Sequence, residues 1–161
     1  MILIGIVHLP QHLNRKLSSY YDFCIEWYGK GCNEMRTIDR WMLSQLHENI
    51  QKATGFMEET LFRSANQNIF FSIHNAMKWY MRRTKDNPNK KVILEVIESQ
   101  LVMLSVFCPF VCEEIWEALG KKGFVSAAEW PSFDTKKVDI TLDVSEKTVE
   151  KTLSDVQAVL K

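Results

Sequence analysis

The stretch FRSANQNIFFSIHNAMKWYMRRT, residues 62–84, has the strongest periodicity in the chain. Apolar residues recur in it every three or four positions, which places them on one face of an α-helix. A face of this kind is normally buried against other helices. The residues on it are Phe62, Ala65, Ile69, Ile73, Met77 and Tyr80. The stretch therefore predicts a core helix.

Segments on both sides of this stretch carry similar patterns. Residues 11–28, 37–57 and 94–108 each show one apolar stripe with helical spacing, which predicts three more helices. Residues 136–144, KKVDITLDV, alternate weakly between polar and apolar residues and predict a short strand. Residues 145–161 predict a last amphipathic helix.

Length and composition agree with a single globular protein. The chain has 161 residues, of which 46% are hydrophobic and 25% charged. We expect an all-α fold, with a helical bundle over residues 1–131 and a small C-terminal appendage over residues 132–161. The apolar N-terminal run lacks the flanks of a signal peptide, and residues 101–112 are too few to span a bilayer. A cytoplasmic protein without a membrane partner is the expectation.

The segment CPFVCEEIW, residues 108–116, predicts a junction between two helices. Pro109 has no amide hydrogen, so it fits the first turn of a new helix better than the interior of an old one. Glu113 and Glu114 would then lie near the positive end of the helix dipole, and Trp116 would anchor the helix. The expected structural anchors of the whole chain are Trp41, Pro109, Glu113, Glu114, Trp116 and Trp130.

The cysteines raise a second interpretation of the same segment. Cys108 and Cys112 could mark a thiol or metal protein, but no cysteine pair has the two-residue spacing of zinc knuckles. The histidines are spread over different predicted elements and do not complete a ligand set. We expect no metal site and no catalytic residue, and the thiol hypothesis stays open as an alternative.

Charge is balanced over the chain but concentrated in one place. The formal net charge is zero, whereas KWYMRRTKDNPNKK, residues 78–91, contains six basic residues and one acidic residue. Lys78 and Arg82 share a helical face, and Trp79 lies beside them, so phosphate contacts and base stacking are both available. The simpler alternative is that these residues stabilise a helix C-terminus and solvate a surface.

Four segments occur in an order that resembles a known family. They are DRWMLSQL (39–46), NIFFSIHNAMKWYMRR (68–83), FCPFVCEEIW (107–116) and KKGFVSAAEWP (121–131). Together they are similar to the helical anticodon-binding domain of class I aminoacyl-tRNA synthetases, and they look most like the leucyl-tRNA synthetases of the archaeal and eukaryotic type. The family junction often reads A-P-x-x-P-H, whereas Val106 replaces its first proline here and Phe110 its histidine.

The resemblance implies a module that docks leucine tRNA along its anticodon stem for the catalytic and editing domains of the same synthetase. It implies contacts to phosphate and ribose more than to base edges. The residues expected to contact tRNA are Lys78, Arg82, Arg83 and Lys85, followed by Arg15, Lys16, Lys90 and Lys91.

The resemblance also limits the chemistry of the chain. The H-x-G-H and K-M-S-K-S signatures of class I ATP chemistry are missing from it. We therefore expect no cofactor in this chain, ATP being a cofactor of the full enzyme only, and no DNA partner. The alternative is a helical protein-interaction domain with a synthetase-like fold.

Overall fold

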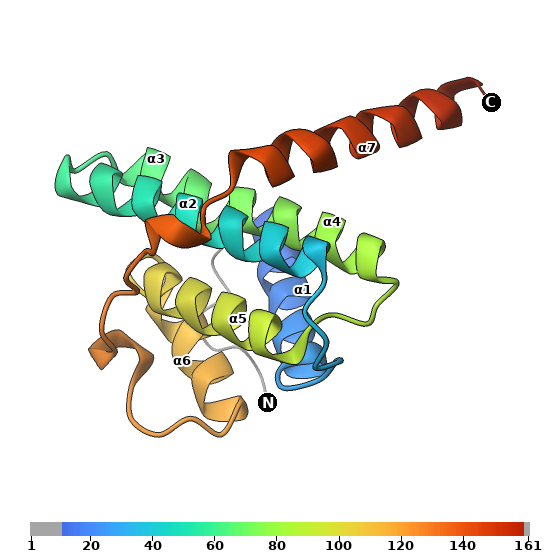
Figure 1. Cartoon of the computed structure of the whole chain (residues 1–161). Helices are drawn as coiled ribbons and strands as arrows, with labels where there is room; N and C mark the ends of the chain where they lie inside the picture. Colours follow the sequence, from blue (N-terminus) through green and yellow to red (C-terminus); the bar gives the residue numbers. More distant parts are fainter. Residues whose placement is uncertain (1–10, 160–161) are drawn as a thin grey trace.

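The computed structural model describes residues 11–159 and shows an all-α fold, as predicted (Figure 1). The remaining terminal residues, which include the apolar run for which no signal peptide is expected, lie outside the described part. Within residues 11–159 the elements are α1 (Gln11–Trp27), α2 (Thr37–Glu58), α3 (Phe62–Asn66), the π-helical turn η1 (Gln67–Ser72), α4 (Ile73–Thr84), α5 (Lys90–Leu104), α6 (Pro109–Ala118), the 3₁₀ turns η2 (Val125–Ala127) and η3 (Thr135–Lys137), and α7 (Ile140–Val159).

The helix predicted over residues 62–84 is divided into α3, η1 and α4. In η1 the backbone widens by one residue per turn, which disturbs the regular hydrogen-bond ladder. The fully buried side chain of Gln100 in α5 donates a hydrogen bond to the carbonyl oxygen of Ile69 at 2.8 Å. This hydrogen bond supplies a partner for the irregular turn from a neighbouring helix.

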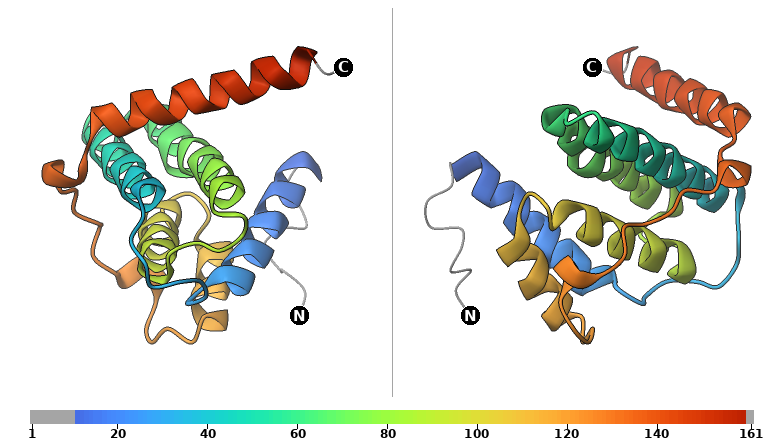
Figure 2. Two further views of the ribbon diagram at one scale, coloured as in Figure 1. Left: turned by 45° about the vertical axis from the view of Figure 1, so that its right-hand side comes forward. Right: turned by 90° about the vertical axis from the view of Figure 1, so that its left-hand side faces the viewer.

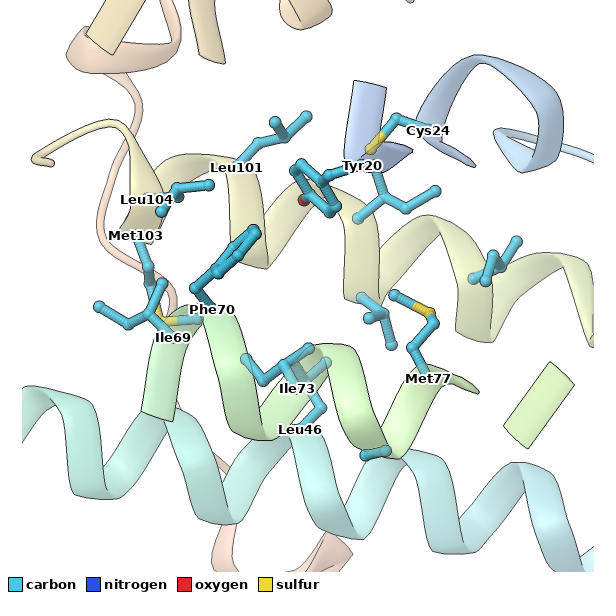
Figure 3. Packing of buried hydrophobic residues seen from close by; sticks show 14 of the residues in the cluster. Tyr20, Cys24, Leu46, Ile69, Phe70, Ile73, Met77, Leu101, Met103 and Leu104 are labelled. Atoms are coloured by element: carbon cyan, nitrogen blue, oxygen red, sulfur yellow. The ribbon is translucent and has the colours of Figure 1, made fainter. Parts of the chain in front are cut away.

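The core lies where α1, α2, α4 and α5 meet (Figure 3). Tyr20 and Cys24 enter it from α1, Ile73 and Met77 from α4, and Leu101 from α5. Side chains of this size each contribute about 1.5–3 kcal/mol when they are fully buried. The apolar stripes predicted from helical spacing therefore converge on one core.

The predicted strand at residues 136–144 is wrong. Residues Thr135–Lys137 form η3, and α7 begins at Ile140. The carboxylate of Asp134 accepts a hydrogen bond from the Lys136 amide, and that of Asp139 accepts one from the Thr141 amide at 2.9 Å. These side-chain caps favour the turn and the helix start, and no neighbouring strand is available for pairing within the described residues.

Helix α7 lies across α2 and α4, and its C-terminal half extends beyond the bundle (Figures 1 and 2). A hydrogen bond of 3.1 Å from Gln45 to Asp143 joins it to α2. The appendage expected after residue 131 is thus a long helix that is docked at its N-terminal end. No helix in residues 11–159 combines the length and the apolar character required to cross a bilayer.

The junction between α5 and α6 has the predicted helix start at Pro109. Helix α5 ends earlier than expected, at Leu104, whose carbonyl oxygen accepts hydrogen bonds from the amides of Phe107 and Cys108. At the other end of α6, Gly120 has a φ of 74°, and the Lys121 amide bonds back to Trp116 at 3.2 Å. This is the left-handed helix end that glycine favours.

The anchors around this junction have different surroundings. Trp41 and Trp116 are buried, while Pro109 is exposed and Glu114 is partly buried. Trp130 is partly buried and donates a hydrogen bond from its indole nitrogen to the Thr54 hydroxyl at 2.9 Å.

Glu113 has another role than the dipole contact expected for it. Its carboxylate accepts hydrogen bonds from the Val125 amide at 2.9 Å, the Ser126 amide at 3.1 Å and the Ser126 hydroxyl at 2.7 Å. It therefore holds η2 against α6. The first turn of α6 contains no acidic residue, because Glu113 follows it.

Candidate nucleic-acid interface

Helix α4 presents its basic residues on two separate faces. Successive residues of an α-helix are about 100° apart around its axis. Arg82 and Arg83 therefore point in different directions, whereas Lys78 and Arg82 lie one turn apart on the same side. The cluster that is contiguous in sequence is divided in space.

Arg83 faces α7 and is held there by Glu146. Its Nε lies 2.9 Å from Oε2 of Glu146, and its second guanidinium nitrogen lies 3.2 Å from Oε1. The indole nitrogen of Trp79 donates to the same carboxylate at 3.0 Å. Burial alone would raise the pKa of Glu146, but the hydrogen bonds from Arg83 and Trp79 outweigh it and lower that pKa. The structure thus gives Arg83 a role in docking α7, and its contact with tRNA stays a prediction.

Lys78 and Arg82 face α1 instead. Both are exposed, and Lys16 of α1 is exposed nearby with its Nζ 4.7 Å from the centre of the Phe71 ring. The pKa of His74 is lowered, first by burial and then by the charges of Lys78 and Lys16, so these groups gather around the imidazole. None of these three cations forms an ion pair within the described part of the chain. They are available to an anionic ligand.

The other predicted contacts lie on α1, at the end of α4 and at the start of α5. Lys85 ends α4 in a left-handed conformation with a φ of 52°, and its side chain is exposed. Lys90 and Lys91 form the exposed first turn of α5, and Arg15 is exposed on α1, about 100° around the helix from Lys16. Sequence spacing within α4 did not indicate that Lys16 would join Lys78, because that proximity depends on how α1 packs.

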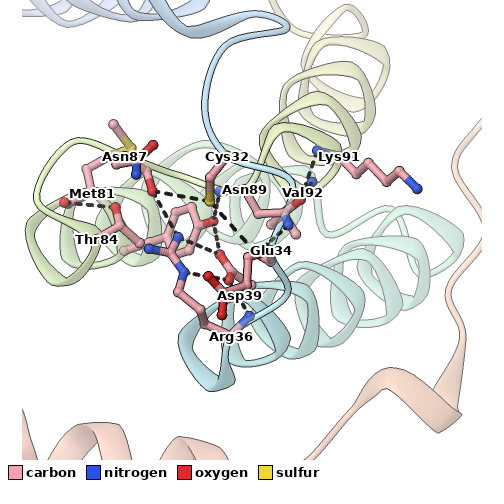
Figure 4. A network of polar contacts seen from close by, with 11 residues as sticks. Cys32, Glu34, Arg36, Asp39, Met81, Thr84, Asn87, Asn89, Lys91 and Val92 are labelled. Carbon is pink, nitrogen blue, oxygen red and sulfur yellow. Dashed lines mark hydrogen bonds and ion pairs between the residues drawn. The ribbon is translucent and has the colours of Figure 1, made fainter.

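A buried polar network fixes the end of α4 to the start of α2 (Figure 4). Asp39 is fully buried and accepts hydrogen bonds from the Arg36 amide at 2.6 Å, from Arg36 Nε at 2.9 Å and from the Tyr80 hydroxyl. Burial alone would raise the pKa of Asp39, but these donors lower it. The hydroxyl of Tyr80 in turn accepts a hydrogen bond of 2.7 Å from the Asn89 amide. Arg36 is the residue at the N-terminal cap of α2.

The same network joins two loops. Asn89 caps α5 through Lys91 and Val92, and its side-chain amide donates to the Glu34 carbonyl at 2.8 Å. Cys32 pairs with the neighbouring backbone on both sides, since its amide donates to Pro88 and its carbonyl accepts from Lys90, each at 2.8 Å. The loop that carries Lys85 and leads to Lys90 is therefore held in place by α2 and its preceding loop.

The cysteines proposed as a thiol site are mainly core residues. Cys112 is fully buried and Cys108 is partly buried, and burial raises the pKa of both thiols. Thiols with raised pKa values remain protonated at neutral pH, whereas metal binding and redox exchange use the thiolate. Among the residues described, no group of three histidine, cysteine, aspartate or glutamate side chains is arranged to hold a metal ion.

Comparison with known proteins adds to this geometry. A family model described as "Anticodon-binding domain of tRNA ligase" matches residues 39–161. The chain belongs to this family. The matched segment begins at the DRW sequence of α2, so α1 of this anticodon-binding domain precedes it.

Two similar relatives are leucine–tRNA ligases. The chain is 36% identical over 145 residues to a leucine–tRNA ligase of Aeropyrum pernix, with 89% of this chain and 15% of the relative covered. It is 34% identical over 155 residues to a leucine–tRNA ligase of Pyrococcus horikoshii, with 92% of this chain and 16% of the relative covered. The anticodon-binding domain therefore spans about one sixth of the length of these relatives.

A solved structure has the same fold. It is a LeuRS of Agrobacterium radiobacter K84 in a ternary complex with tRNA and LeuAMS, and the match has a TM-score of 0.68 at 21% identity. It covers 81% of this chain and 17% of the other. The predicted helical-bundle architecture is confirmed by this likeness.

Proposed function

We propose that this anticodon-binding domain docks the anticodon stem of leucine tRNA for a leucyl-tRNA synthetase. The observation that carries the proposal is the exposed group of Lys16, Lys78 and Arg82 on one side of α1 and α4, which has no ion-pair partner among residues 11–159. Cations placed in this way bind the phosphate backbone without reading sequence. The likeness to leucine–tRNA ligases supports the choice of leucine tRNA.

The aminoacylation chemistry belongs to other domains in this proposal. The chain contains neither ATP signature of the class I enzymes. Its role is to hold one end of the tRNA while catalytic and editing domains act at the other. ATP is then a cofactor of the whole enzyme, and the place of action is the cytoplasm.

The test is a salt titration of tRNA binding. Fluorescence anisotropy with a labelled leucine tRNA transcript would give Kd between about 50 and 200 mM salt, a range over which binding to phosphates weakens steeply. The double variant Lys78→Gln, Arg82→Gln is expected to bind more weakly and to reduce the slope of log affinity against log salt by about two, one for each phosphate that is no longer neutralised.

A matched control removes two positive charges elsewhere. Lys52 lies on the exposed side of α2 and Lys151 on the exposed part of α7. The double variant Lys52→Gln, Lys151→Gln is expected to keep the wild-type slope. Equal losses of affinity in the two double variants, or a flat salt response of the wild type, would contradict docking through α4.

A second function is favoured by one observation on the surface. Val106 and Phe110, which replace the proline and histidine of the family junction, are 55% and 77% exposed. Exposed apolar side chains of this size suit a protein contact. In the proposed function that contact is with another domain of the synthetase, while in the alternative it is the main activity. A protein partner captured equally by the wild type and by the Lys78→Gln, Arg82→Gln variant, without tRNA binding, would favour the alternative.

A further inference from the structure

The connector between η2 and α7, residues 128–139, contains η3 and packs along α2 (Figure 1). Three side chains of α2 hold it by hydrogen bonds. The pairs are Thr54 with the Trp130 indole at 2.9 Å, His47 with the Asp134 amide at 3.1 Å, and Ser44 with the Asp139 amide at 2.8 Å. Helix α7 begins at Ile140, directly after the last of these contacts. The position at which α7 starts therefore depends on how firmly α2 holds the connector.

His47 is the one of these three α2 side chains that can change its charge near neutral pH. Its side chain is buried, and both nitrogens of the ring are in use. Nδ1 accepts the hydrogen bond from the Asp134 amide, so this nitrogen carries no proton. Nε2 lies 3.0 Å from Oε1 of Glu95, and it carries the proton and donates to this carboxylate. The observed contact with the connector therefore requires a neutral His47.

Charged groups from two elements surround this histidine. Glu95 of α5 contacts Nε2, and Lys137 of η3 donates to the same carboxylate oxygen at 2.8 Å. The carboxylate of Asp134 accepts a hydrogen bond from the Lys136 amide. The hydrogen bond from His47 is the main cause that lowers the pKa of Glu95 to about 2, and lysines ordinarily stay charged below about pH 10. Between about pH 8 and pH 5 the titrating group of this cluster is therefore the imidazole.

We propose that His47 is a pH-sensitive switch, which holds the connector on α2 while the ring is neutral and releases it when Nδ1 is protonated. A protonated Nδ1 is a donor, and it would face the Asp134 amide, which is a donor too. The hydrogen bond between them is then replaced by repulsion. Glu95 stays ionised and keeps its contact with Nε2, so the ring remains at α5 while the connector leaves it. The switch concerns the docking of α7 and does not depend on RNA binding.

The direction of the pH effect follows from proton uptake. With the connector bound, Nδ1 of His47 is occupied by the Asp134 amide and takes no proton. With the connector released, Nδ1 is free, and the carboxylate of Glu95 favours the charged ring. Release thus binds a proton, so a fall in pH favours it by up to about tenfold for each pH unit below the range in which the released ring titrates. The contact between Ser44 and Asp139 comes next along the connector, and we expect the start of α7 to loosen with it.

Hydrogen exchange of the full chain between about pH 8 and pH 5 tests the switch. The amides of Asp134 and Asp139 are the reporters, because α2 side chains accept their hydrogen bonds. Their protection, corrected for the intrinsic exchange rate at each pH, should fall by about tenfold or more from about pH 7 to pH 5. Core amides of α5 should keep their protection, since the bundle itself does not open.

Two variants separate His47 from other causes of pH dependence. His47→Gln keeps a donor for Glu95 but cannot titrate, so the protection of the two reporter amides should not depend on pH in this variant. His74→Gln is the matched control, because it removes a histidine that lies between α4 and α1, and it should behave as the wild type does. Constant protection in the wild type, or the same pH dependence in His47→Gln as in the wild type, would overturn the proposal.

An NMR titration of the wild type does not depend on how well a variant folds. The ring signals of His47 report protonation, and the amide signal of Asp134 reports the connector. Both should change with the same midpoint, while the amide of Ile97 in the core of α5 should not follow them. Different midpoints, a ring that stays neutral down to about pH 5, or a parallel change at Ile97 would each overturn the proposal.

Discussion

Gly31 lies where the loop after α1 meets the loop between α4 and α5, which carries Lys85. Its φ is +117°, and a Cβ atom at this position would lie 2.1 Å from the carbonyl oxygen of Pro88. That oxygen already accepts the hydrogen bond from Cys32. Side chains larger than hydrogen are therefore excluded both by backbone conformation and by space.

We predict that Gly31→Ala destabilises the chain by at least about 2 kcal/mol, because strain at a left-handed position adds to a steric clash. Gly55→Ala is the matched control, since this glycine lies within α2 with nothing within 4 Å of the added Cβ. It is expected to stabilise by about 0.5–1 kcal/mol through helix propensity. Urea unfolding followed by circular dichroism would measure both. A loss of stability at position 31 no larger than about 1 kcal/mol would disagree with the close approach to Pro88.

The side chain of Glu95 makes the stability of the fold depend on pH. Its Oε1 lies 3.0 Å from Nε2 of His47 and 2.8 Å from Nζ of Lys137. The Asp134 amide donates to Nδ1 of the same imidazole, so Nε2 carries the proton and donates to Glu95. The hydrogen bond from His47 is the main cause that lowers the pKa of Glu95 to about 2, and Lys137 adds to it.

A carboxyl group whose pKa is lower in the folded than in the unfolded chain stabilises the fold above its unfolded pKa. We predict that the contribution of Glu95 is complete above about pH 4.5 and is lost as the pH falls towards about 2. Glu95→Gln should be less stable than the wild type at pH 7 and equally stable near pH 2. Thermal unfolding across this pH range is the measurement, with Glu117→Gln at an exposed site as the control. A constant difference between wild type and Glu95→Gln over the whole range would contradict the ion pair.

At the scale of elements, the docking of α7 depends on few polar contacts. Glu146 lies on α7 where it meets α4, and it receives hydrogen bonds from both Arg83 and Trp79. Its side chain is only 11% exposed, so its removal leaves two donors without an acceptor in a partly buried place. The rest of α7 exposes most of its side chains.

We predict that Glu146→Ala loosens α7 without unfolding the bundle. Hydrogen exchange of amides in residues 141–150 should accelerate by about tenfold or more, while amides of α2 and α5 keep their protection. Glu146→Gln, which retains an acceptor for Trp79, should lie between the two. Thr148→Ala, at an exposed position of the same helix, serves as the control. Unchanged exchange in Glu146→Ala would show that apolar contacts alone dock α7.

The sequence predicted those helices that bury one apolar face. It predicted the candidate nucleic-acid interface only in part. The apolar spacing of residues 11–28, 37–57 and 62–84 located α1, α2 and the α3 to α4 segment, because a buried stripe requires this period. The strand expected at residues 136–144 failed, since two aspartate caps are local signals that outweigh weak alternation. The partners of Glu113 and Arg83 lie on other elements, so no local pattern indicated them.

At the scale of the whole molecule, the basic surface and the apolar surface lie on different elements. Lys16, Lys78 and Arg82 are on α1 and α4, whereas Val106 and Phe110 flank the start of α6. In the proposed function the basic residues contact RNA and the exposed apolar residues contact neighbouring domains of the synthetase. The proposed functions can therefore be tested independently by changing one surface at a time.

Helix α7 also has a mechanical consequence. It contains 20 residues, and Val149 still packs against the core, so about 10 residues beyond Val149, or about 15 Å of helix, project past the bundle. A tilt of about 10° around that contact would displace the far end by about 2.6 Å, given the rise per residue of an α-helix. The Arg83–Glu146 pair and the packing of Val149 therefore set the direction in which the exposed end of α7 points.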